Sequence, residues 1–139
     1  MLKKRLIAGM AACLMAVSAF SVSASTYAWT DTIRVYKNQG AYLTNACVKL
    51  NTQNYFKVNI QPDKNVSDAW SQGTELIYAR ARDVNNNYAS SLVETRYAGN
   101  FTPKYYSGYG VFSYSYKCAA QYADSNPYQY AALTLNWEP

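Results

Sequence analysis

The side chains that could carry chemistry in this 139-residue chain are eight carboxylates, fifteen tyrosines and three cysteines, and histidine is absent. Without histidine, Ser–His–Asp and Cys–His mechanisms are excluded, and zinc loses one of its usual ligands. Glycoside hydrolysis needs two carboxylates on either side of a cleft, and no spacing among the Asp and Glu residues pairs them. We therefore predict a protein that is not an enzyme, with no catalytic residue, no metal site and no cofactor.

One segment follows the oxygen-ligand template of a calcium loop. Asp83, Asn85 and Asn87 alternate, and Glu94 comes eleven residues after Asp83, which matches template positions 1, 3, 5 and 12. Tyr88 stands where the template needs Gly, and the sequence on both sides is typical of strands. Because Asn tolerates positive φ, we interpret the segment as an Asn-rich hairpin turn, with calcium binding as the open alternative.

The tyrosines are the most unusual component, and all fifteen follow residue 24. Tyrosine offers apolar area and a hydroxyl at low entropic cost, which suits a contact surface. Gly108 and Gly110 interrupt a dense tyrosine set, and loops at strand ends often carry function. We expect any binding surface around Tyr105, Tyr106 and Tyr109; the alternative is that these are ordinary strand residues.

Two cysteines remain after the first 24 residues, Cys47 and Cys118, and they lie 71 positions apart. An even number of cysteines in a secreted domain indicates a disulfide. We therefore predict a structural Cys47–Cys118 bond. By the loop-entropy model, such a bond contributes about 4 kcal/mol to stability.

Strands must position these residues, because apolar and polar side chains alternate with period two along much of the chain. The alternation is found in residues 29–35, 46–50, 55–60, 77–82, 92–97, 111–118 and 131–137. No segment shows an apolar stripe of helical period. We predict an all-β fold, one antiparallel β-sandwich of about seven short strands in an Ig-like or jelly-roll-like arrangement.

The parity of these strands also predicts the core. The inward residues are expected to be Trp29, Ile33, Val35, Val48, Phe56, Val58, Ile77, Phe112, Leu133 and Leu135. Turns are predicted at 38–40 and 85–87, because both contain Asn and the first ends in Gly.

The first 24 residues have the pattern of a bacterial secretory signal peptide. A basic start at residues 3–5 precedes an uncharged apolar run over 6–20 and the small side chains of 22–24. That run is shorter than the roughly 20 residues that span a membrane. We predict a signal peptide over 1–24, a single domain over 25–139, a secreted extracellular protein, and no transmembrane segment after cleavage. Whether Cys13 is instead a lipidation site stays open.

Loss of the signal peptide changes the charge of the protein. The formal net charge falls from +5 to +2, because three of the thirteen basic residues leave and all eight acidic residues stay. The remaining cations are scattered, which argues against a nucleic-acid partner. We expect instead a cell-wall polymer, a carbohydrate or another protein as partner, and the oligomeric state stays open.

Several stretches carry a resemblance to known families. They are VYKNQG, FKVNI, GTELIYARA, YYSGYG and the closing NWEP. In these the chain resembles a family of small secreted Gram-positive proteins known only as a domain of unknown function, and this resemblance transfers no activity. The stretch GYGVFSYSY is similar to lactococcin-type bacteriocins, which act on the cell envelope.

Two functions follow from these observations. The first is a secreted non-catalytic extracellular binding or structural protein with a Tyr-rich contact surface. The alternative is a secreted antimicrobial of the lactococcin type that acts on the cell envelope. We rank the binding protein first, because a charge of +2 is weak for a membrane agent that depends on Lys and Arg.

Overall fold

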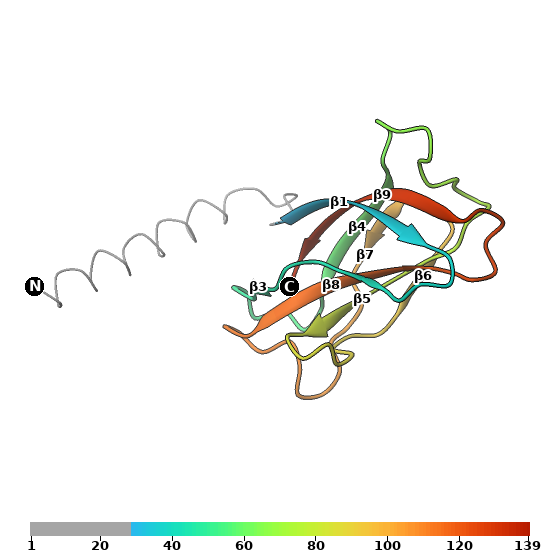
Figure 1. Cartoon of the computed structure of the whole chain (residues 1–139). Helices are drawn as coiled ribbons and strands as arrows, with labels where there is room; N and C mark the ends of the chain where they lie inside the picture. Colours follow the sequence, from blue (N-terminus) through green and yellow to red (C-terminus); the bar gives the residue numbers. More distant parts are fainter. Residues whose placement is uncertain (1–28) are drawn as a thin grey trace, which may run out of the picture.

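Residues 29–139, the part that the computed structural model describes, form two antiparallel β-sheets packed face to face (Figure 1). The strands are β1 (Trp29–Tyr36), β2 (Tyr42–Leu43), β3 (Cys47–Val48), β4 (Lys57–Pro62), β5 (Ile77–Asp83), β6 (Val93–Thr95), β7 (Gly99–Phe101), β8 (Ser115–Tyr122) and β9 (Tyr130–Glu138). One sheet has the order β1-β9-β4-β7, and the other has the order β2-β8-β5-β6, with β3 also paired to β8. The predicted all-β antiparallel sandwich is confirmed.

The core lies between the long central strands of the two sheets. Period-two alternation turns Leu133, Leu135 and Trp137 of β9 inward, where they meet the inward side chains of β8, such as Tyr116 and Tyr122. The Trp137 ring lies 5.8 Å from that of Phe56, measured between centroids. Burial of such apolar surface contributes about 25 cal/mol per Å². The alternation therefore stabilises the fold by placing these apolar side chains in the core.

The predicted boundaries of one strand were wrong. Strand β8 begins at Ser115, not at residue 111, because the chain turns before it: Ser113 has φ 68° and the Tyr114 N–H bonds the Val111 carbonyl at 3.2 Å. Phe112 therefore lies outside the core and is 54% exposed. Val48, also predicted as core, is 46% exposed on β3.

The predicted disulfide is not formed in this structure: Cys47 and Cys118 are both free and buried. Cys47 lies opposite Tyr116, so Cys118 is its diagonal neighbour on the same face. Diagonal positions of an antiparallel pair are about 7–8 Å apart, beyond the usual reach of a disulfide. Burial, with a smaller contribution from the Asp31 carboxylate, raises the pKa of the Cys47 thiol to about 11 and raises the pKa of Cys118 as well.

The predicted signal peptide over residues 1–24, with Cys13, lies outside the described residues. Within residues 29–139, no helix is long and apolar enough to cross a bilayer.

Candidate functional site

The candidate site is a cavity of about 450 Å³ at one end of the sandwich, between two loops. One loop follows β5 and the other precedes β8. The lining residues are Asp83, Val84, Asn85, Gly108, Tyr109, Tyr114, Ser115 and Tyr116. The tyrosine-rich stretch singled out in the sequence and the calcium-like template are thus brought to the same place.

The first loop is a hairpin turn held by the carboxylate of Asp83. Its Oδ1 accepts from the backbone N–H groups of Asn85 and Asn87 at 2.9 and 2.8 Å, and its Oδ2 accepts from the Asn87 side chain at 2.8 Å. Partial burial opposes ionisation, but these hydrogen bonds hold the pKa of Asp83 below its usual value. Asn86 takes the positive φ of 68°, so the predicted Asn-rich turn is confirmed.

The calcium template is not assembled. Glu94 lies opposite Tyr78, five residues along β5 from Asp83, which is about 16 Å at the usual rise of a strand. Residues 29–139 contain no group of three His, Cys, Asp or Glu side chains that could hold a metal ion. The oxygens of Asp83 serve the turn instead.

The second loop is anchored by Tyr105, which the sequence placed on the contact surface. This assignment was wrong, because Tyr105 is 5% exposed and its ring lies 5.0 Å from that of Tyr116. The Lys49 ammonium lies 5.1 Å from the Tyr105 ring centroid. The Tyr105 hydroxyl is buried without a hydrogen-bond partner, and burial raises its pKa.

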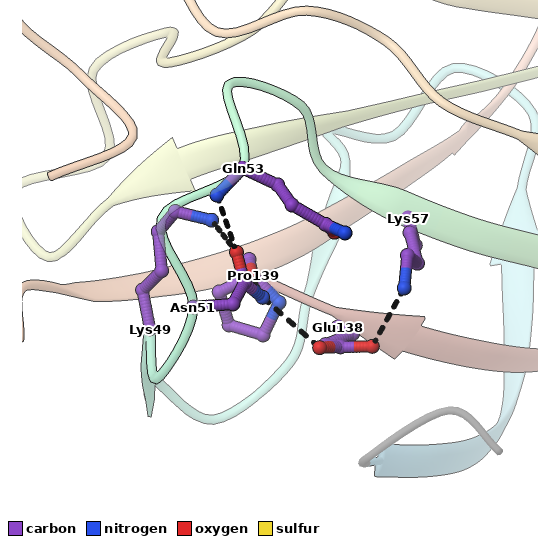
Figure 2. A network of polar contacts seen from close by, with 6 residues as sticks. All are labelled: Lys49, Asn51, Gln53, Lys57, Glu138 and Pro139. Carbon is purple, nitrogen blue, oxygen red and sulfur yellow. Dashed lines mark hydrogen bonds and ion pairs between the residues drawn. The ribbon is translucent and has the colours of Figure 1, made fainter. Parts of the chain in front are cut away.

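A polar network joins Lys49 to Glu138 and Pro139 at the end of the chain, as Figure 2 shows. The Lys49 ammonium donates to Asn51 Oδ1 at 2.5 Å, and Asn51 Nδ2 donates to Glu138 Oε1 and to the Pro139 carbonyl, both at 3.0 Å. Glu138 also pairs with the Lys57 ammonium at 3.4 Å. Lys49 itself is fully buried, and desolvation lowers its pKa to about 8.

Backbone contacts fix the rest of this loop. Gly110 has φ +74°, and a Cβ there would lie 2.5 Å from Tyr105 Cδ2, so only glycine fits. The Val111 N–H donates to the Tyr116 hydroxyl at 3.0 Å. The backbone of Lys49 accepts from Ser113 at 2.9 Å. The loop is therefore held in one conformation from both sides.

The exposed aromatic side chains differ in part from those predicted. Tyr106 is exposed as expected, while Tyr109 is half-buried and lines the cavity. Tyr114 lines it too and is 61% exposed, although it was not among the residues predicted for the contact surface. The sequence does contain a signal for this exposure. Gly108 and Gly110 indicate a loop, and that loop extends closer to the start of β8 than the alternation of apolar residues suggests.

A second hollow, of about 510 Å³, is lined by two carboxylates, Asp68 and Glu75. The Arg34 guanidinium holds both oxygens of Asp68, at 2.6 and 3.2 Å, and this hydrogen bonding holds the pKa of Asp68 below its usual value. Glu75 is buried and accepts from the Ser71 N–H and the Tyr122 hydroxyl. Both carboxylates therefore form hydrogen bonds within the fold, which gives them a structural role.

Comparison with known proteins gives no further guide to this site. No family model, no curated protein and no solved structure matches the chain. The resemblances to the family of unknown function and to the bacteriocins stay predictions, and the site must be interpreted from its own geometry.

Proposed function

We propose that this protein is a secreted, non-catalytic extracellular binding protein that holds uncharged sugar rings of a cell-wall glycan at the loop end of the sandwich. The observation that carries the proposal is the cavity of about 450 Å³ with Tyr109 and Tyr114 on its wall. Tyrosine rings offer flat apolar faces, and their hydroxyls provide hydrogen bonds to orient a ligand.

The chemistry of the cavity favours a neutral ligand. Its single charged side chain, Asp83, already accepts three hydrogen bonds from its own turn. Asn85 adds an amide, and Ser115 adds a hydroxyl. Because both loops are held by the fold, little conformational entropy is lost on binding.

Sedimentation with insoluble chitin and with purified peptidoglycan tests the proposal. We expect the wild type to sediment with the glycan, and Tyr109→Ala and Tyr114→Ala to lower the bound fraction at least fivefold. Tyr97→Ala is the matched control, because Tyr97 is 66% exposed and lies beyond the opposite end of β5, where Ile77 pairs with Thr95. Equal sedimentation of folded Tyr114→Ala and wild type would contradict the proposal.

The antimicrobial alternative has one supporting observation. Val48, Leu50, Val111 and Phe112 are exposed, and hydrogen bonds between Lys49 and the loop join β3 to the residues beside Phe112. Apolar side chains grouped in this way suit the headgroup layer of a membrane. Binding to lipid vesicles without glycan binding, lost in Phe112→Ser, together with growth inhibition of related bacteria, would favour this function.

A further inference from the structure

A groove crosses the outer face of the five-stranded sheet, away from the loop cavity. Alternation along β5 turns Tyr78, Arg80 and Arg82 outward while Ile77, Ala79 and Ala81 face the core. Strand β8 runs beside β5 (Figure 1). The groove lies over this pair of strands and has a volume of about 210 Å³.

The groove exists because its floor is made of small side chains. Ala119 of β8 lies directly opposite Arg80, and Ala41 precedes β2 on the far side of β8. The walls are made of larger residues, namely Tyr78, Arg80, Arg82, Tyr88, Leu92 and Gln121. Its volume is below the roughly 300–1,000 Å³ of drug-sized pockets, so the groove suits one sugar ring or a group of similar size.

Two guanidinium groups share one aromatic ring at the wall of this groove. The centre of the Arg80 guanidinium lies 4.1 Å from the Tyr88 ring centroid, and that of Arg82 lies 4.9 Å from it. Such stacking is favourable for Arg and fixes the plane of each guanidinium. It also brings two like charges together, which costs free energy unless an anion lies nearby.

Among the described residues, no carboxylate forms an ion pair with Arg80 or Arg82. Within residues 29–139, the ion pairs join Arg34 to Asp68 and Lys57 to Glu138. Arg82 Nη1 makes a long hydrogen bond of 3.4 Å to the Asn86 carbonyl, and its Nε is buried without a partner.

The other charges on this face leave an excess of positive charge. Lys117 lies opposite Arg82, and its ammonium bonds the Asn86 side chain at 3.0 Å. Glu94, opposite Tyr78, is the carboxylate on the neighbouring strand. Asp83 ends β5 beside Arg82, and the Lys117 charge contributes to lowering its pKa. Three cations against these two carboxylates still leave a positive charge, which is complementary to an anion.

We infer that this groove binds an anionic sugar unit, with its carboxylate or phosphate held by Arg80 and Arg82. Guanidinium groups match both oxyanions in geometry. The rings of Tyr78 and Tyr88 offer apolar faces to the sugar, and Gln121 offers an amide. This second site is independent of the proposed function, because it uses other residues on another face.

Titration of the purified protein with glucuronate, glucose 6-phosphate and glucose, followed by NMR of the arginine Nε–H groups, tests the inference. We expect both anions to shift the Arg80 and Arg82 resonances, with the tighter ligand identifying carboxylate or phosphate, and glucose to bind at least tenfold more weakly. Binding should weaken as sodium chloride is raised from 50 to 500 mM. Arg80→Gln should raise the Kd at least tenfold, whereas Arg96→Gln, in a different loop, should leave it unchanged.

Three results would overturn the inference: equal binding of glucose and the anions, no shift at either arginine, or an unchanged Kd in folded Arg80→Gln. The wild-type titration decides the matter even if the variant does not fold. Tyr114→Ala should leave this binding intact, which separates failure here from failure of the glycan proposal.

Discussion

Polar side chains lie on the outer faces of both sheets, but they make different contacts on each. On the four-stranded sheet, Asn59 donates to the Asn100 side chain at 2.8 Å, and Asn136 donates to Asn59 at 3.3 Å. On the five-stranded sheet, Arg80 and Arg82 stack on Tyr88, and no carboxylate of residues 29–139 is in ion-pair contact with them. Asparagines of the first face bond one another, whereas Arg82 Nε on the second face has no hydrogen-bond partner.

The same contrast separates the tyrosines of the loop end. Tyr105 is buried against Tyr116 and Lys49, while Tyr114 is exposed at the cavity. Side chains that pack against or bond their neighbours stabilise the fold, and exposed side chains without such contacts are available to a ligand. Substitutions of the first kind should therefore lower stability, and substitutions of the second kind should lower binding.

The largest effect is expected at Tyr105. Tyr105→Ala should lower the free energy of unfolding by about 3–5 kcal/mol, because it empties a buried aromatic site. Tyr105→Phe should be neutral or stabilising, since the lost hydroxyl has no partner. Tyr114→Ala should change stability by less than about 0.5 kcal/mol. Urea denaturation measures all three, and equal losses in Tyr105→Ala and Tyr114→Ala would break the contrast.

Gly110 provides the next largest effect. Gly110→Ala should lower stability by about 1–3 kcal/mol, because φ of +74° strains an L-residue and its Cβ would collide with the Tyr105 ring. Gly40→Ala is the control, since nothing lies within 4 Å of a Cβ there. Thermal unfolding of the two variants should differ clearly, and similar melting temperatures would show that the loop is not fixed as described.

Lys49 should give a pH dependence of about 1 kcal/mol. Its pKa of about 8 in the folded protein lies below that of an unfolded lysine, about 10.4. Between these values the unfolded chain binds more protons, so stability rises with pH. From pH 7 to pH 9, the wild type should gain about 1 kcal/mol relative to Lys49→Met. Histidine, the usual source of pH dependence near neutrality, is absent, and parallel profiles would contradict this assignment.

The smallest effects separate the two outer faces directly. Asn59→Ala should cost about 0.5–1.5 kcal/mol of stability, since it removes hydrogen bonds to two neighbouring asparagines. Arg80→Gln should stay within about 0.5 kcal/mol of the wild type, because its guanidinium forms no ion pair with any carboxylate that the structure describes. Matched urea titrations check the pair, and a larger loss in Arg80→Gln would mean that the arginine serves the fold.

The fold could be predicted from the sequence because its main signal is local. Alternation along β4, β5 and β9 identifies both the strands and their inward residues. The start of β8 could not be found in this way, since Ser113 takes a positive φ that is uncommon for serine and the alternation continues through the turn. Strands β2 and β7, of two and three residues, are too short to show a period.

The site was only partly predictable, because strand pairing between segments far apart in the sequence decides which residues line it. The glycines of the loop indicated where to expect a contact surface, but the burial of Tyr105 depends on Lys49 and Tyr116. The groove depends on the register that sets Ala119 opposite Arg80. No local pattern in the sequence contains that register.

The most direct test of the account is to map a neutral glycan onto the protein by NMR. Titration with chitotetraose should shift the backbone amides of Asn85, Tyr109 and Tyr114, and should leave those of Asn59 and Asn136 on the four-stranded sheet unchanged. The central claim is that exposed side chains without packing or hydrogen-bond contacts in the fold are the ones that bind. Shifts confined to the asparagine face, or no shift at the loop end at saturating glycan, would contradict it.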